Sequence, residues 1–165
     1  MSPPPALPNV APDSIAMMPI GVVRSSRDEA IDDDWDAVES RIELDPAQFT
    51  ADATAGLDTF SHVEVIFVFD RVTDDRIETG SRHPRGRPDW PKVGIFAQRA
   101  KDRPNRIGTT VCSVLGLDGL VLRVSGLDAI DGTPVLDVKP YLDGFGPRGP
   151  VREPAWSIEL MADYW

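Results

Sequence analysis

The sequence predicts an all-β protein, a small antiparallel β-barrel with short helices, and three observations support this fold class. Short β-branched and aromatic runs alternate with turn residues over most of the chain. Asp-Gly pairs, which favour hairpin turns, recur at Asp118-Gly119, Asp131-Gly132 and Asp143-Gly144. Strands and helices do not alternate along the chain, so no Rossmann domain is expected.

The individual elements follow from local patterns. Strands are expected at 18–25, 41–44, 62–72, 93–98, 107–117, 120–124 and 134–138. In the fifth of these, period two groups every second residue on one face: Ile107, Thr109, Val111, Ser113, Leu115 and Leu117. A helix is expected over 46–56, capped by Asp45 and ended by Gly56. A second short helix is expected within 154–165, docked by Trp156, Leu160 and Trp165.

Length and composition indicate one domain. The chain has 165 residues, of which 41% are hydrophobic, and this suits a single core. Residues 1–16 hold five prolines and are predicted to be a disordered leader, so the domain is placed at 17–165. The first residues lack the basic start and apolar core of a secretory signal. No apolar run approaches the roughly 18 residues of a membrane span. Cytoplasm is therefore the expected compartment, with no membrane partner.

Charge is distributed unevenly. The net charge is −10, yet residues 76–106 carry nine basic and three acidic residues, which makes this basic segment +6 and the remainder −16. A positive patch on an acidic body can hold one anionic ligand while disfavouring bulk polyanions. The alternative is a solvated loop whose arginines pair with acidic residues elsewhere.

Several kinds of site are poorly supported. Two histidines and one cysteine cannot form a Cys/His zinc site, and no metal ligand is assigned. Cys112 lies in an expected strand, where a buried, inert thiol is the usual outcome. His62 is interpreted as a structural hydrogen-bonding residue, and His83 as a phosphate or solvent contact. The G-x-G-x-x-G match at 144–149 lacks the strand and helix of a dinucleotide site and is interpreted as a surface turn.

Two polar stretches carry the functional signal. In 93–108, VGIFAQRAKDRPNRIG, Arg99, Arg103 and Asn105 offer donors for a carboxylate or phosphate. Gly108 in the same stretch would allow a ligand or another backbone to approach closely. In 125–141, SGLDAIDGTPVLDVKPY, carboxylates gather near a sheet end and could accept a ribose diol or attract a sulfonium. The same aspartates are also ordinary turn residues.

Five ordered motifs between about residues 18 and 142 resemble the TsaA-like family, also called the TrmO family. They are PIGVVRS, LDTFSHVEVIFVFDR, RHPRGRPDWP, VGIFAQRAKDRPNRIG and LDAIDGTPVLDVKPY. The resemblance implies a small β-barrel enzyme, usually a homodimer. It would bind S-adenosyl-L-methionine as cofactor and methylate N6 of threonylcarbamoyl-adenosine beside the anticodon of tRNA.

The resemblance also implies site residues. Those expected to bind the cofactor are Asp70, Arg71, Arg99, Thr109, Ser125, Gly126, Leu127 and Asp128, with a further loop within 32–36. Those expected to bind the substrate are Arg82, Arg85, Arg103 and Asn105. The candidate catalytic residues are Asp131, Asp137, Lys139 and Tyr141, among which Asp131 or Asp137 is the candidate base.

Three departures from the family pattern bear on the substrate. Arg106 replaces a proline, Asp70 replaces a histidine, and the acidic run 31–36 replaces a proline- and glycine-rich loop. Alternatives to a tRNA methyltransferase are the same cofactor with another RNA or a small-molecule substrate, and a non-catalytic sensor. A further alternative is a barrel whose basic segment only makes a dimer contact.

Overall fold

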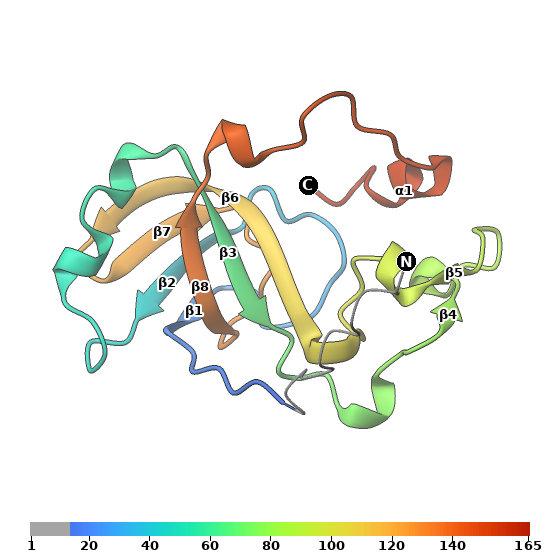
Figure 1. Cartoon of the computed structure of the whole chain (residues 1–165), viewed down its shortest axis with the longest axis horizontal. Coiled ribbons are helices and arrows are strands. Elements are labelled where there is room, and N and C mark those ends of the chain that lie inside the picture. Colours follow the sequence, from blue (N-terminus) through green and yellow to red (C-terminus); the bar gives the residue numbers. More distant parts are fainter. Residues whose placement is uncertain (1–13) are drawn as a thin grey trace, which may run out of the picture.

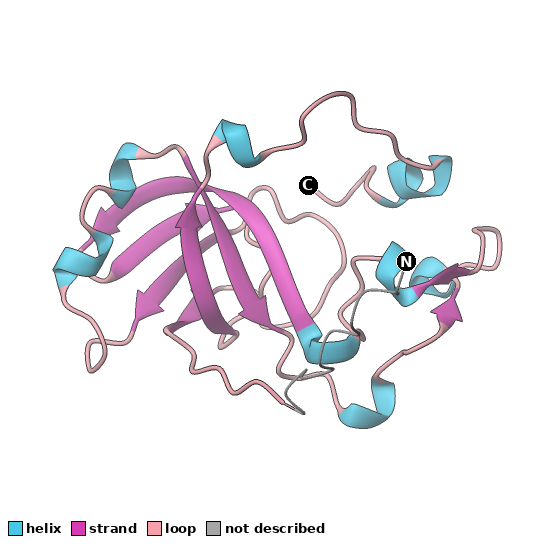
Figure 2. Cartoon of the chain, in the orientation of Figure 1, coloured by secondary structure: helices cyan, strands magenta, loops and turns pink. Residues whose placement is uncertain are grey.

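The computed structural model describes residues 14–165 and consists of a closed barrel with a small two-stranded unit beside it (Figures 1 and 2). The barrel strands are β1 (Gly21–Ser25), β2 (Glu39–Leu44), β3 (His62–Val68), β6 (Ile107–Asp118), β7 (Val121–Ser125) and β8 (Pro134–Pro140). The small unit pairs β4 (Ser81–Arg82) with β5 (Val93–Gly94), and α1 (Ala155–Leu160) follows near the end of the chain. The predicted leader lies outside the described residues up to position 13.

The barrel is antiparallel throughout and closes between strands distant in sequence. Its order is β1-β2-β7-β6-β3-β8, and β8 pairs back to β1 through Gly21 with Val135 and Val22 with Pro134. The predicted fold class, a mainly β antiparallel barrel, is confirmed. Within residues 14–165, no helix has the length and apolar character that crossing a membrane requires.

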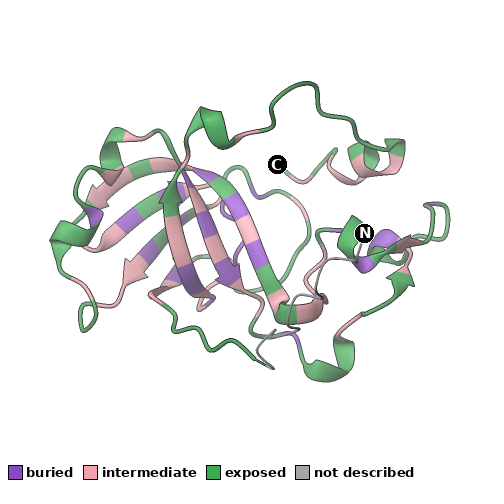
Figure 3. Cartoon of the chain, viewed as in Figure 1, coloured by how far each residue is buried: buried purple, intermediate pink, exposed green. Residues whose placement is uncertain are grey.

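The core fills the barrel interior, because alternate residues of each strand point inward (Figure 3). In β3, Val63, Val65 and Phe67 are buried, whereas their neighbours in sequence are not. Leu127 and Ala129, in the loop after β7, also join this core. The interior is therefore packed with side chains, and a ligand has to bind at an end or on the outside.

In the first part of β6, the residues that period two groups on one face point outward. Gly108, Thr110 and Cys112 are buried, whereas Ile107, Val111 and Leu115 are exposed. Both faces of this strand carry apolar residues, so periodicity alone could not choose between them. A register shift between Val114 and Gly116 then changes which residues of the strand point inward beyond it.

Three further local predictions need correction. The 46–56 helix is absent: Asp45 does accept the amide of Ala47 at 2.9 Å, but only a 3₁₀ turn at Ala51–Thr54 follows. The hydroxyl of Thr54 instead bonds the carbonyl of Gly119, 2.8 Å away, which ties this segment to a distant hairpin. The strand at 93–98 ends at Gly94 and continues as a 3₁₀ turn, Ile95–Ala97. The strand at 62–72 ends at Val68.

Of the three Asp-Gly pairs, only one forms the predicted hairpin. Asp118-Gly119 joins the paired strands β6 and β7. Asp131-Gly132 lies in the crossing from β7 to β8, and the Gly132 amide donates to the Val23 carbonyl. Asp143-Gly144 begins a 3₁₀ turn. Turn chemistry specifies a local bend, whereas strand pairing depends on the whole sheet.

One end of the barrel collects most of the predicted site residues. At this end β1, β3 and β7 finish, and β2, β6 and β8 begin, as the pairs Ser25–Ser40, Glu39–Ser125 and Val68–Ile107 show. We call this end, with the loops 26–38, 69–71, 99–106 and 126–133, the loop rim.

Candidate functional site at the loop rim

The turn after β7 offers unpaired main-chain donors. Gly126 has φ +74, a conformation that glycine adopts without strain, and its amide donates to the Val38 carbonyl at 3.2 Å. Among residues 14–165, the amides of Leu127 and Asp128 have no acceptor. Because unpaired amides next to a buried segment are uncommon, this turn is suited to a ligand with hydrogen-bond acceptors.

Asp128 is the half-buried carboxylate of this turn. Its Oδ1 accepts the hydroxyl of Thr110 on β6, and its Oδ2 accepts the hydroxyl of Tyr164. Two hydroxyl donors, one for each oxygen, hold the carboxylate in a fixed orientation.

Arg99 approaches the same place from the basic segment. Its guanidinium donates to the carbonyl of Thr109, 2.5 Å away and next in sequence to Thr110. Burial is the main cause of the raised pKa of the Tyr164 hydroxyl; Asp128 raises this pKa further, and Arg99 lowers it. Arg99 and Asp128 therefore both lie near Tyr164 at the loop rim.

Arg71 and Asp131 form a second connection at the loop rim. The Arg71 guanidinium donates to the carbonyls of Asp28 and Asp131, at 2.9 and 3.0 Å. The Asp131 Oδ1 accepts the amide of Ser25 at 3.0 Å. Asp70, beside Arg71, is exposed. Main-chain and carboxylate bonds thus fix the end of β3 against the end of β1.

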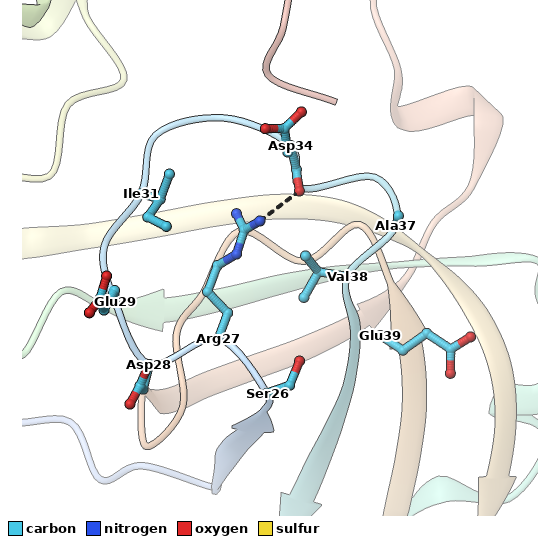
Figure 4. A pocket seen from close by; sticks show the side chains of 9 residues that line it. All are labelled: Ser26, Arg27, Asp28, Glu29, Ile31, Asp34, Ala37, Val38 and Glu39. Carbon is cyan, nitrogen blue, oxygen red and sulfur yellow. Dashed lines mark hydrogen bonds between the residues drawn. The ribbon is translucent and has the colours of Figure 1, made fainter.

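The acidic loop between β1 and β2 borders a groove of about 570 Å³ (Figure 4). Arg27 organises this loop, because its guanidinium donates to the carbonyls of Asp33 and Asp34 at 2.8 and 2.9 Å. The same group lies 4.2 Å from the ring centroid of Trp35, which is buried. The predicted 32–36 loop therefore lies at the rim, next to the turn that contains Gly126.

Tyr164 is a rim residue that the sequence analysis missed. The expected docking of the 154–165 segment is confirmed for Trp156, whose ring centroid lies 6.4 Å from that of Trp90. Trp165 is half exposed, and its ring contacts the Tyr164 ring edge-on. No local pattern distinguishes a tyrosine that packs from one that reaches a carboxylate 36 residues away.

Three candidate catalytic residues do not lie at the loop rim of this chain. Asp137 and Lys139 form an ion pair on the outer face of β8, and they pair in register with Ile66 and Glu64 on the outer face of β3. Tyr141 lies further along, where its amide donates to His62. Of the four candidates only Asp131 is at the rim.

Most of the basic segment is neutralised. Five of its nine cations form ion pairs: Arg76 and Arg82 with Asp102, Arg85 with Asp33, Arg87 with Asp89, and Arg106 with Asp74. Arg103 donates to the Gln98 carbonyl at 3.0 Å, and Asn105 is exposed with φ +64. Of the predicted substrate residues, Arg85 lies against the acidic loop of the rim, whereas Arg82, on β4 of the two-stranded unit, is held by Asp102.

The remaining titratable candidates serve the structure. Cys112 is buried and inert, because burial raises the pKa of its thiol to about 12. His62 bonds the hydroxyls of Ser61 and Ser113, as expected for a structural role. His83, expected to contact phosphate or solvent, is half-buried and bonds the carbonyl of Trp90 at 2.7 Å. Among the described residues, no group of three His, Cys, Asp or Glu side chains could hold a metal ion.

Comparison with known proteins now identifies the family. Residues 32–146 match the model of the tRNA-methyltransferase O N-terminal domain. The chain belongs to this family. A crystal structure of TrmO from Pseudomonas aeruginosa superposes with a TM-score of 0.67 and 31% identity, over 84% of this chain and 61% of that one.

Curated relatives of this family include proteins named as methyltransferases and proteins named as S-adenosylmethionine-binding. The tRNA (adenine(37)-N6)-methyltransferase of Escherichia coli is 40% identical over 96 residues, 56% of this chain and 40% of that protein. A protein of Methanothermobacter thermautotrophicus, named a "Probable S-adenosyl-L-methionine-binding protein", is 36% identical over 139 residues, 82% of this chain and 96% of its own length. The chain spans 46% of a Pseudomonas aeruginosa relative and 24% of the human methyltransferase.

Proposed function

We propose that this chain is an S-adenosylmethionine-dependent methyltransferase that acts on N6 of an adenine in tRNA. The observation that carries the proposal is the convergence at the loop rim of the Leu127 and Asp128 amides, the Asp128 carboxylate and Arg99. Family membership and the name of the Escherichia coli relative supply the reaction and the substrate class.

The rim residues fit an adenosyl cofactor. Free amides in a buried turn suit the nitrogen acceptors of adenine, and a guanidinium suits the carboxylate of the methionine moiety. When bound, S-adenosylmethionine supplies a methyl group already activated on a sulfonium. The protein then has to align the acceptor nitrogen with that group and keep water away from it.

Asp131 is the base candidate that the geometry favours over Asp137. Its Oδ2 has no partner among residues 14–165, while Oδ1 is fixed by the Ser25 amide. Asp137 is instead paired with Lys139 on the outer face. As the N6 nitrogen accepts the methyl group, the carbon–sulfur bond of the donor would break to leave a neutral thioether, and the N6 proton would pass to the Asp131 carboxylate.

The specific adenosine that is methylated is threonylcarbamoyl-adenosine, as the family resemblance implies. Purified chain is incubated with S-adenosylmethionine and tRNA that carries or lacks the threonylcarbamoyl group, and nucleosides are analysed by mass spectrometry. We expect a mass gain of one methyl group in the modified adenosine alone. Methylation of tRNA that lacks the threonylcarbamoyl group would contradict this specific substrate. Absence of methylation on both RNAs would contradict the tRNA function.

A second candidate is an S-adenosylmethionine-binding protein with a different substrate. Two observations favour it: the Methanothermobacter relative that matches over 96% of its length bears that name, and the basic segment is largely paired with acidic residues. A thermal shift with S-adenosylmethionine but no methyl transfer to any tRNA would select this candidate.

The homodimer that the resemblance implies has support on the outer face of β6. Ile107, Val111 and Leu115 expose about 40% of their surface in a row along this strand, an arrangement that favours contact with another apolar face. Light scattering of the purified chain should give twice the mass of 18.1 kDa. Cytoplasm stays an expectation from the sequence.

A further inference from the structure

The segment that follows the family domain returns to the loop rim. The matched domain ends at residue 146, yet the chain continues through α1 to Tyr164, whose hydroxyl reaches Asp128. Figure 1 shows this last part running from the side of the two-stranded unit toward the barrel. We call residues 155–165 the closing segment.

Hydrogen bonds hold the closing segment at both of its ends. At the α1 end, the indole of Trp90 donates to Glu159 at 2.8 Å. At the other end, the carbonyls of Asp163 and Tyr164 accept the amides of Asp34 and Trp35, at 3.0 and 2.9 Å. Main-chain pairing with the acidic loop makes the segment a continuation of the rim.

The Tyr164 side chain lies among groups from three loops of the site. Its hydroxyl bonds Asp128, and Arg99 and Asp32 are close enough to act on it electrostatically. Removing this hydroxyl would leave only Thr110 on the Asp128 carboxylate, which could then rotate. Because the Asp128 amide belongs to the same turn, a loose carboxylate would also loosen the donors proposed to hold the cofactor.

We propose that Tyr164 is a positioning residue of the methyl-donor site, which orients Asp128 together with Thr110, and that the last three residues of the closing segment, 163–165, form one wall of that site. This inference rests on the proposed cofactor. It adds to the family domain a residue from outside the matched range.

The test compares Tyr164→Phe, which keeps the ring, with the wild-type chain. Isothermal titration with S-adenosylmethionine should show about tenfold weaker binding, the size expected when a buried carboxylate loses one donor. In methylation assays the KM for S-adenosylmethionine should rise while kcat at saturation stays within about twofold. Ser157→Ala is the matched control, because it removes a hydroxyl of the same segment that bonds only Glu153 and Pro154; its affinity should be unchanged.

A double-mutant cycle separates positioning from general loosening. If Tyr164 acts through Asp128, the affinity of the double variant Tyr164→Phe/Asp128→Asn should differ from that of Asp128→Asn alone by less than about twofold. Unchanged affinity in Tyr164→Phe would overturn the inference, and so would full additivity. Tighter binding would also overturn it, because the segment would then block the site. If wild-type chain binds no S-adenosylmethionine, the proposed function itself fails.

Discussion

Arg99 has the most direct bearing on the proposed function at the scale of single residues. Its guanidinium already contacts the Thr109 carbonyl at the rim and has no carboxylate partner among residues 14–165. A bound ligand carboxylate would therefore not have to displace an internal ion pair. Each of the five paired cations of the basic segment would have to break an internal ion pair to bind such a carboxylate.

Arg99→Ala should abolish measurable binding of S-adenosylmethionine, because the variant loses the charged donor for the ligand carboxylate. Calorimetry of wild-type and variant chains measures this directly. Lys101→Ala, which removes the same charge two residues away, should bind like the wild type. Equal affinities of wild type and Arg99→Ala would remove Arg99 from the site.

Cys112 allows a prediction about pH. Burial, and secondarily Asp128, raise the pKa of its thiol from 9.0 to about 12. Between these values the unfolded thiol loses its proton while the folded thiol keeps it, so the free energy of unfolding falls as pH rises above about 9. In urea unfolding between pH 8 and 10, the free energy of unfolding of Cys112→Ala should decline less steeply with pH than that of the wild type.

The burial of the thiol can also be tested by labelling. Iodoacetamide at pH 9 should label unfolded chain quickly and folded chain slowly; rapid labelling of folded chain would contradict the burial.

Strand β6 shows at the scale of elements how the core constrains a motif. Gly108, which the sequence suggested as a point of ligand or backbone approach, faces the rings of Phe67 and Phe69. A Cβ at this position would lie 2.5 Å from Phe67 Cε2 and 2.9 Å from Phe69 Cζ. The glycine is thus required by the core beneath the rim, since a fully buried ring has little room to move.

Gly108→Ala should lower the free energy of unfolding by about 1–3 kcal/mol, the usual cost of overpacking a core. Chemical denaturation followed by tryptophan fluorescence measures this change. Gly144→Ala is the control, because a Cβ there meets nothing within 4 Å, and its stability should stay within about 0.5 kcal/mol of wild type. A Gly108→Ala chain as stable as the wild type would mean that Phe67 moves freely.

The charge distribution matters at the scale of the whole molecule. The chain is acidic, and within the basic segment only Lys92, Arg99, Lys101 and Arg103 lack a carboxylate partner among the described residues. Affinity for tRNA therefore has to come mainly from specific contacts rather than from a broad positive surface.

The salt dependence of tRNA binding should consequently be weak. With at most four free cations from this segment, the slope of log K against log salt should be no steeper than about −3.6. Filter binding at several potassium chloride concentrations gives this slope. A value near −6 or steeper would show that RNA phosphates replace the internal acidic partners of the arginines.

Local sequence was sufficient for several strands. Alternating apolar runs and turn residues predict β3, β7 and β8, because side-chain period and turn conformation depend on a few neighbouring residues. Motifs shared with the family singled out Arg99, Asp128 and Asp131, which the structure places at the loop rim, and their roles in binding and catalysis stay predictions. The short α1 was found from its aromatic spacing.

Contacts between distant residues decided the rest. The closure of β1 on β8, the inward face of β6 and the 3₁₀ turn in place of the 46–56 helix depend on which surfaces fit together in the core. Likewise, the pairing of Arg85 with Asp33 and of Tyr164 with Asp128 joins residues 52 and 36 positions apart. The sequence by itself determined the fold class and named part of the rim. Only the tertiary structure decided which charges are free and that Tyr164 reaches Asp128, because those properties depend on distance in space.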